Sequence, residues 1–569
     1  MTARHLLQCR LRDALSAINL DPTAAEVSAA ADTRFGDYQS NTAMVLAKRE
    51  RQNPRALATQ IAEAIDVTGL SSPPEIAGAG FLNFRLDTSF LERTVKELRQ
   101  DPRAGCEMLL APKTIIIDFS SPNVAKPMHV GHIRSTILGD CLCRVARFLG
   151  HRVIADNHIG DWGTQFGKII YGWKHLLNRE ALAAQAIPEL LRLYRDVNAL
   201  EATDDAVKMS VREELVKLQA GDPENLSIWR QVVDTSLVEF QKIYAVLDVQ
   251  FDEHLGESFY NDALSPLVDR CIADGIARES EGAICVFFAE DGPLAANPCV
   301  IRKSDGGFLY ATTDLATIAY RTGRWNPDAI WYVTGAPQAL HFQQVFTAAR
   351  MMGQTFAAEH VPFGSILGED RKIMKTRSGE NVQLGDVLTE AVDRARAVIA
   401  TKNPDLPPDE MESIATAVGI GAVKYAELSQ HRMTDYVFSW DKMLSFQGNT
   451  APYLQNACVR IQAIFRRLDE AVDLDSGNVV ISADAERALA VKLLQFGEVV
   501  PLVLDDFRPN LLVNYLYELA TTFHAFYESC PVLKSEGETR ISRLILCDTS
   551  LRILTTGLSL LGIRTPERM

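Results

Sequence analysis

A short apolar run followed by two closely spaced histidines constrains this 569-residue chain more than any other feature. Residues 114–117 read Thr-Ile-Ile-Ile, which is typical of a fully buried strand. Residues 133–149 repeat apolar side chains at helical spacing, and Gly150 follows as a stop signal. His129 and His132 are therefore expected where a strand turns into a helix, on one helical face. Free backbone N–H groups and the positive end of the helix dipole favour an anion there.

Two other interpretations of the histidine pair stay open from these residues alone. The spacing fits half of a zinc site, although no Glu stands at the second position and no cysteine pair is nearby. A capped helix start without any ligand is also compatible with so short a motif. Gly131, between the histidines, lacks a side chain and predicts close approach of a flat or charged ligand. We expect no protein-ligated metal site.

Composition narrows the class of protein. Hydrophobic residues make up 47% and charged residues 23%, as in ordinary globular proteins. No apolar run reaches the roughly 18 residues of a membrane span, and the N-terminus lacks an apolar signal core. The ten cysteines include no Cys-x-x-Cys pair, which predicts reduced thiols in the cytoplasm. The net charge of −15 argues against a generally basic binder of DNA, but a local basic groove could still bind RNA.

Strands alternate with helices from about residue 113, which predicts a parallel sheet. The expected strands are 114–117, 153–155, 329–333 and 363–367, with a mostly helical, charged segment from about 178 to 250. Residues 403–410 predict a break, and the chain beyond them is nearly all helix, at 414–429, 449–468, 484–504, 511–530 and 542–562. Before the sheet, helices at 5–18 and 54–65 and a strand at 80–86 predict a separate α+β module.

The histidine region carries a resemblance to a known family. Residues 120–136 read Ser-Ser-Pro-Asn-x-x-Lys-Pro-x-His-x-Gly-His-x-Arg-Ser-Thr. This stretch resembles the HIGH region of class I aminoacyl-tRNA synthetases, in the form seen in the arginyl-tRNA synthetase family. The resemblance is densest at 114–167, 305–345, 364–388 and 436–456, and it includes 35–41, 78–86 and the ending 562–569.

The resemblance implies a multidomain α/β fold. We expect an N-terminal α+β domain (1–108) that contacts the tRNA elbow and a Rossmann-like parallel-sheet catalytic domain (109–388) with a helical insertion at about 178–250. A helical connector (389–435) and a C-terminal all-α anticodon-binding bundle (436–569) would follow. The insertion is too short for an editing domain, and a site built to pair a guanidinium has little need of one.

The activity implied is activation of L-arginine with ATP, followed by transfer to the 3′-terminal adenosine of tRNA-Arg. The resemblance assigns catalysis to His129, His132, Lys375 and Lys126, and ATP binding to Gly131, Lys372, Met374 and His341. The arginine pocket would use Asp118, Asn123, Glu257, Tyr310, Asp314 and Gln338. Contacts to tRNA are expected at Asn41, Tyr453 and Arg460. Three convergent carboxylates are reasonable only in a pocket that binds a cation.

The basic loop after the fourth strand departs from the family pattern. Lys372 and Lys375 are in register with the two lysines of the KMSKS sequence, whereas Ile373, Met374 and Thr376 replace its other residues. The resemblance therefore favours Lys375 over Lys372 as the lysine that binds the triphosphate. Lys126 resembles a displaced lysine that some arginyl enzymes use instead.

The expected partners are tRNA-Arg, L-arginine and ATP carrying Mg²⁺, with no prosthetic group, no DNA, no membrane and a monomeric state. Three rival functions remain. A class I synthetase for another amino acid would lack the set Asp118, Tyr310 and Asp314, and a nucleotidyltransferase would not need a helical C-terminal half. A non-catalytic tRNA-binding paralogue should have lost the histidines or lysines, which this chain retains.

Overall fold

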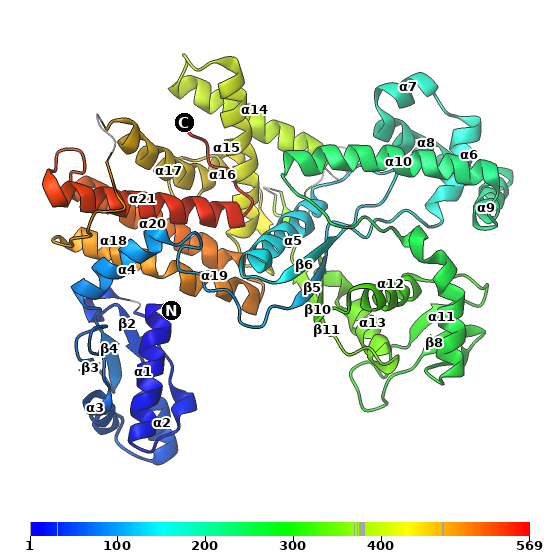
Figure 1. Cartoon of the computed structure of the whole chain (residues 1–569). Helices are drawn as coiled ribbons and strands as arrows, with labels where there is room; N and C mark the ends of the chain where they lie inside the picture. The colour runs from blue at the N-terminus through cyan, green and yellow to red at the C-terminus, as the bar shows by residue number, and fades with distance from the viewer. Residues whose placement is uncertain (1, 31, 369, 373, 375–381, 469–471) are drawn as a thin grey trace. The chain divides into compact units, whose positions relative to one another are not determined.

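The computed structural model describes residues 2–30, 32–368, 370–372, 374, 382–468 and 472–569. They form two compact units, one comprising Met1–Met108 with Ser445–Met569 and the other Leu109–Leu444 (Figure 1). Among the helices of the described residues, none is long and apolar enough to cross a membrane.

A four-stranded parallel sheet is the centre of the unit Leu109–Leu444. Its strands are β5 (Thr114–Asp118), β6 (Arg152–Asp156), β10 (Ala329–Gly335) and β11 (Ala357–Phe363), in the order β11-β10-β5-β6. The predicted parallel sheet is confirmed. The chain continues to one side from β5 to β6 and to the other from β10 to β11. Ligands of such sheets bind at the carboxyl ends of the two central strands, where the winding direction changes.

Helices pack against this sheet and carry the candidate site residues. They are α5 (Gly131–Phe148), α12 (Tyr310–Trp325) and α13 (Ala339–Met351), the last preceded by the 3₁₀ turn η4 (Ala336–Gln338). In contrast, α6 (Gln165–His175) packs against the helices that follow it in the chain. The expected helix at 133–149 is confirmed as α5. Gly150 follows it with φ of 101°, a conformation that favours glycine and ends the helix.

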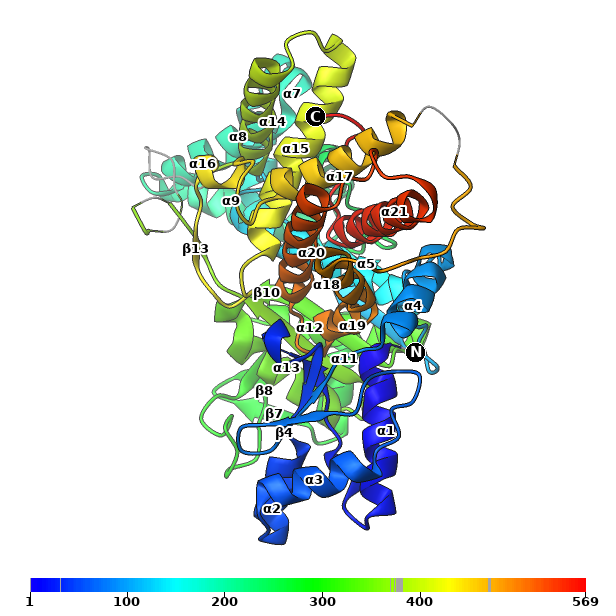
Figure 2. The same ribbon diagram turned by 90° about the vertical axis from the view of Figure 1, so that its left-hand side faces the viewer.

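Four helices between β6 and β10 occupy the segment where a helical insertion was expected. They are α7 (Arg179–Ala184), α8 (Ala186–Glu201), α9 (Asp205–Gln219) and α10 (Pro223–Val246). Asn178, Asp204 and Asp222 accept hydrogen bonds from the first turns of α7, α9 and α10, which explains where these helices begin. Figure 1 and Figure 2 both place α7 and α8 above the parallel sheet and β8 (Ala283–Val286) below it.

The chain between the insertion and β10 forms a small subdomain. It contains η3 (Glu257–Tyr260), α11 (Asn261–Ala273) and an antiparallel sheet of β7 (Ala277–Ser280), β8 and β9 (Cys299–Arg302). Its apolar side chains join those of β10, α12 and α13 in one core cluster.

The expected strand at 363–367 is wrong, because the chain breaks after β11. Pairing resumes at β12 (Ile366–Leu367), which runs parallel to β13 (Tyr436–Val437). A β-carbon on Gly364 would lie 2.6 Å from Asp435 Oδ1, so the two segments approach too closely for another residue there. The predicted break at 403–410 is confirmed.

Three helices complete this unit around that break. They are α14 (Leu384–Lys402), α15 (Pro408–Leu428) and the short α16 (Trp440–Met443). Asp409 and Glu410 lie in the first turn of α15, where acidic side chains stabilise the helix dipole.

The other unit contains an antiparallel sheet and the C-terminal helices. The sheet has the order β1 (Ser28–Ala29), β2 (Tyr38–Ser40), β4 (Phe81–Phe84), β3 (Glu75–Ala77). The surrounding elements are η1 (Pro22–Ala24), η2 (Thr33–Phe35), α1 (Ala3–Ala17), α2 (Thr42–Glu50), α3 (Pro54–Ala64) and α4 (Thr88–Gln100). The expected helices at 5–18 and 54–65 and the strand at 80–86 are confirmed.

The C-terminal helices are α17 (Ala451–Arg466), α18 (Asp484–Leu494), α19 (Phe496–Asp505), α20 (Pro509–Ser529) and α21 (Gly537–Leu560), and Figure 2 shows α17, α18, α20 and α21 side by side. The expectation of one helix over 484–504 is wrong, because the chain turns at Gln495 between α18 and α19. Gly497 there approaches Gly105 so closely that a β-carbon would lie 2.3 Å from the Gly105 carbonyl oxygen.

Candidate active site

The connection between β5 and α5 carries both histidines and has a strained backbone. Ser120, Ser121 and Ala125 have φ of 73°, 45° and 61°, a region that residues other than glycine seldom occupy. Hydrogen bonds hold the loop in place. The Ser120 N–H donates to Ser135 Oγ at 2.8 Å, and the Ser121 N–H donates to Asn157 Oδ1 at 3.1 Å. Side chains from α5 and from the end of β6 therefore fix the loop before any ligand binds.

His129 and His132 lie against each other, with ring centroids 4.0 Å apart. The spacing predicted that both would lie on one helical face. This prediction is wrong, because α5 begins only at Gly131 and His129 precedes it. The His129 N–H donates to Nδ1 of His132 at 3.0 Å, and the Gly131 N–H donates to Nδ1 of His129 at 3.1 Å. Since both Nδ1 atoms accept, each neutral ring carries its proton on Nε2. Both rings can then donate Nε2–H to an anionic oxygen.

The pKa values of both histidines are lower than that of an ordinary histidine. Burial, followed by the neighbouring His129, lowers the pKa of His132 to about 3. Burial and then the positive charge of Lys126 lower the pKa of His129. The rings are therefore neutral donors near pH 7, and the ammonium of Lys126 lies close enough to act on His129.

The basic loop is described only in part. Lys375 lies outside the described residues. Lys372 and Met374 are described, and the loop closes on itself where the Gly368 N–H donates to the Lys372 carbonyl at 2.8 Å. The Met374 N–H donates to the Ile366 carbonyl at 3.3 Å, which ties Met374 to β12.

The residues that follow the basic loop pair with residues 128–130 of the histidine loop, the connection between β5 and α5. The Val130 N–H donates to the Val382 carbonyl at 2.8 Å, and the Leu384 N–H donates to the Met128 carbonyl at 2.8 Å. His129 and Gln383 are opposite each other in this short antiparallel bridge. The chain thus returns to the histidines directly before α14.

Asp118, at the end of β5, lies in a buried ion pair that the sequence did not reveal. Arg321 of α12 donates to Asp118 Oδ2 at 2.5 Å and to Asp156 Oδ2 at 2.8 Å. Arg321 is 0% exposed and Asp118 4% exposed. Burial opposes the charged form, but Asp156 and Asp118 raise the pKa of Arg321 well above its ordinary value. The only available signal was the position of Arg321, seven residues after Asp314 on the same helical face.

The start of α12 presents Tyr310 and Asp314 as expected. Tyr310 is the first helical residue and is 71% exposed, so its ring is accessible to a ligand. Asp314 Oδ2 lies 2.5 Å from Nε2 of His341 on α13. The structure thus brings together Asp314, predicted to bind arginine, and His341, predicted to bind ATP.

Glu257 is the third carboxylate of this region. Its backbone N–H donates to the Ile159 carbonyl at 3.1 Å, and the backbone N–H of Trp162 favours the charged form of its carboxylate. Burial, followed by the charges of Asp314 and Asp161, raises the pKa of Glu257 to about 8. A carboxylate destabilised by two others is one that a cationic ligand would stabilise.

Asn123 and Gln338 are both exposed, at the ends of the two central strands. Asn123 pairs with Gly160, where a β-carbon would lie 2.2 Å from Asn123 Oδ1. Gly160 therefore leaves room for that amide, and the glycine-rich segment 156–167 lies against the histidine loop. Gln338 ends η4 directly before α13.

Among the described residues, no group of three or more His, Cys, Asp or Glu could hold a metal ion.

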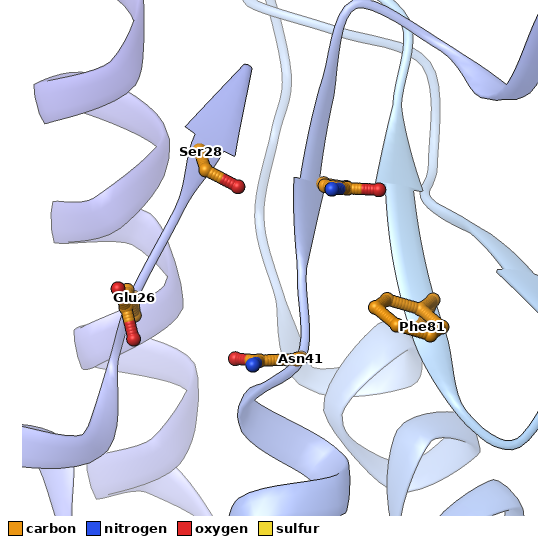
Figure 3. Close-up of a pocket in the computed structure, with 5 residues that line it drawn as sticks. Glu26, Ser28, Asn41 and Phe81 are labelled. Carbon is orange, nitrogen blue, oxygen red and sulfur yellow. The ribbon is translucent and has the colours of Figure 1, made fainter. Parts of the chain in front are cut away.

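Asn41 lies in a small surface pocket of the N-terminal sheet. The pocket is lined by Glu26, Ser28, Gln39, Asn41 and Phe81, and four of these side chains are labelled in Figure 3. Asn41 stands at the N-terminus of α2 without capping it through its side chain. Its amide and the Phe81 ring together offer hydrogen bonding and stacking, the two contacts by which proteins hold an unpaired base.

Tyr453 and Arg460 share a cluster of aromatic side chains between α17 and α20. Tyr453 stacks on His524 with ring centroids 5.1 Å apart at 22°. The Arg460 guanidinium carbon lies 5.7 Å from the Tyr527 ring centroid, and its Nη1 lies 3.5 Å from His524 Nδ1. His524 and Tyr527 were not among the predicted residues. Tyr453 is half-buried, so its side chain packs in the protein and is also partly accessible to a ligand.

Comparisons with known families cover nearly the whole chain. Residues 3–86 match the arginyl tRNA synthetase N terminal domain, and residues 95–440 match the catalytic domain of class I (R) tRNA synthetases. Residues 454–569 match the DALR anticodon binding domain.

Individual proteins are similar over the same length. An arginine–tRNA ligase of Synechococcus elongatus is 47% identical over 556 residues, covering 95% of this chain and 94% of that protein. One of Cellvibrio japonicus is 44% identical and covers 100% of both chains. The crystal structure of arginyl-tRNA synthetase from Plasmodium falciparum superposes with a TM-score of 0.83 at 29% identity, covering 100% of this chain and 98% of that one. The Thermus thermophilus arginyl-tRNA synthetase gives 0.82 at 25% identity and covers 100% of both chains.

Proposed function

Since the chain belongs to the class I arginyl-tRNA synthetase family, we propose that it activates L-arginine with ATP and transfers the arginyl group to tRNA-Arg. Two features of the structure support the assignment of the site. Two neutral histidine donors follow β5. The carboxylate of Glu257 lies near that of Asp314, in the first part of α12. The first arrangement suits phosphate oxygens, and the second suits a guanidinium.

The reaction has two steps, and the protein mainly positions reactants. An oxygen of the arginine carboxylate attacks the α-phosphorus of ATP, and pyrophosphate leaves with its Mg²⁺. A hydroxyl of the terminal ribose of tRNA-Arg then attacks the arginyl carbonyl, and AMP leaves. His129 and His132 donate Nε2–H to the phosphate oxygens where negative charge develops. Lys126, Lys375 and Lys372 bind the outer phosphates, with Gly131 and Met374 close to the nucleotide.

Different residues of the arginine pocket bind the two ends of the amino acid. Asp314 and Tyr310 bind the guanidinium, since a planar cation favours a carboxylate and an aromatic flank. Glu257 adds negative charge once arginine is present. Asn123 and Gln338 hold the α-amino and α-carboxyl groups.

Two predicted site residues already have partners in the protein. Asp118 is neutralised by Arg321, so we propose that it contributes to the pocket through this pair rather than as a free charge. His341 contacts Asp314, and its proposed ATP contact requires that its other ring face or nitrogen reach the nucleotide.

The proposal extends to partners and location. Asn41 contacts the tRNA elbow, and Tyr453 and Arg460 contact the anticodon region. The protein acts as a monomer, without DNA or membrane, and its ten free cysteines, nine of them buried, fit a reducing cytoplasm. ATP enters with Mg²⁺ as a substrate complex.

The function is tested by charging. We expect the protein to attach labelled arginine to a tRNA-Arg transcript and to attach none of the other amino acids. Charging with lysine in place of arginine, or no charging with any amino acid, would contradict the proposal.

The affinity for arginine is expected to depend on pH through Glu257. Below about pH 8 this carboxyl is protonated and neutral, and above it the carboxylate can pair with the guanidinium, which stays charged throughout. The KM for arginine should therefore fall up to about tenfold between pH 7 and 9. The Glu257→Gln variant, measured at the same pH values, should lose this dependence. An identical pH profile in the two proteins would contradict the assignment.

Gly131→Ala is expected to lower the rate of arginine activation about tenfold, because a misplaced catalytic group costs this much or more. The new β-carbon would lie 2.8 Å from Cε1 of the His129 ring and would push it aside. Pyrophosphate exchange measures the effect. The matched control is Gly323→Ala on α12, where a β-carbon meets nothing within 4 Å. Equal rates in the two variants would show that the histidine ring tolerates the displacement.

A further inference from the structure

Lys126 belongs to the β5–α5 connection that carries the histidines, and it lies next to the inserted helices α7–α10. Its Nζ is 5.0 Å from the ring centroid of Tyr194 on α8, which is a cation–π distance. The same charge acts on His129, whose pKa is lowered by burial and then by Lys126. One ammonium group is therefore close both to the proposed phosphate site and to the insertion.

The backbone before Lys126 is anchored in the insertion. Val124 and Ala125 are fully buried and belong to the same apolar cluster as Leu190 of α8. The Ala125 N–H donates to Ser236 Oγ of α10 at 3.0 Å, which stabilises its left-handed φ of 61°. Since α8 and α10 fix this backbone, the insertion determines where the Lys126 side chain begins.

Tyr194 also contacts a second lysine, which has other partners. Lys168 Nζ lies 5.5 Å from the same ring centroid, but it pairs with Glu201 at 2.8 Å and donates to Asn198 Oδ1 at 2.6 Å. Within the described part of the chain, the Lys126 ammonium has no carboxylate partner of this kind, and it contacts the Tyr194 ring. Of the two lysines, Lys126 is thus the one available to an anion.

We propose that Tyr194 is a positioning residue for Lys126, and that its ring holds the ammonium group ready to contact the ATP phosphates. The inference rests on the proposed role of Lys126 in binding ATP. A lysine already held against a ring loses less side-chain freedom on binding than a free one. Removing the ring should therefore weaken the use of ATP and leave the arginine pocket unaffected.

The test compares kinetic constants for the two substrates in the full-length protein. Tyr194→Leu keeps an apolar side chain in the cluster but removes the ring, and it is expected to raise the KM for ATP about fivefold. The KM for arginine should stay unchanged. Tyr194→Phe keeps the ring and should restore the wild-type KM for ATP. Lys168→Met, the matched control, removes the other lysine from the same ring and should leave both constants unchanged.

A double variant separates the positioning role from a structural one. In a Lys126→Met background, Tyr194→Leu should cause no further rise in the KM for ATP. The same fivefold rise there, or no rise in Tyr194→Leu alone, would overturn the proposal. If Lys126→Met itself left the KM for ATP unchanged, the assignment of Lys126 to ATP would fail first. Thermal unfolding of each variant confirms that the fold is retained.

Discussion

His132→Ala is expected to lower the rate of arginyl-adenylate formation on the order of 10²-fold or more. The substitution removes the Nε2–H group proposed to donate to the phosphate and the Nδ1 acceptor of the His129 N–H. Because burial lowers the pKa of His132 to about 3, the loss should be the same across the neutral pH range. Single-turnover formation of the adenylate measures it.

His132→Asn is the informative comparison for this prediction. Its side-chain oxygen can accept the His129 N–H, and its amide is a shorter donor, so an intermediate rate is expected. Unchanged activation in the alanine variant, with a normal unfolding temperature, would remove His132 from the catalytic assignment.

Lys375→Ala is expected to have an effect of similar size, on the order of 10²-fold, through the outer phosphates.

Arg321→Met should have the largest effect on stability, lowering the free energy of unfolding by about 3–5 kcal/mol. The substitution leaves Asp118 and Asp156 buried without the cation that pairs with both of them. Urea unfolding of the full chain, followed by tryptophan fluorescence, measures the loss.

The matched control lies on the same helix. Arg324→Met removes an ion pair with Glu253 in which the arginine side chain is 43% exposed, so its effect should be far smaller than that of Arg321→Met. Replacing Asp156 with Asn in the Arg321→Met protein should recover part of the loss. Equal stability of the two single variants would contradict the role of Arg321 as the buried counter-charge.

Local sequence was sufficient for the elements that depend on neighbours in the chain. The strand at 114–117 and the helix after His132 follow from apolar periodicity, and Gly150 ends that helix as expected. Tyr310 and Asp314 appear together at the start of α12 because four residues make about one helical turn.

Features set by distant segments were not predictable. Arg321 contacts Asp118 across 203 positions in the chain, and its helical spacing from Asp314 does not identify Asp118 as the partner. The turn at Gln495 is next to Gly497, which closely approaches Gly105 in a separate part of the sequence. The proton on Nε2 of each histidine depends on two backbone contacts to Nδ1, which motif spacing cannot specify.

Arginine-dependent exchange of pyrophosphate into ATP, with and without tRNA-Arg, tests the central claim most directly. A panel of other amino acids serves as the control for the arginine pocket proposed at Asp314, Tyr310 and Glu257. The account predicts exchange with arginine alone, and its appearance only when tRNA is added would reveal a tRNA requirement for activation. Binding of tRNA without exchange for any amino acid would contradict the account and indicate a non-catalytic tRNA-binding protein.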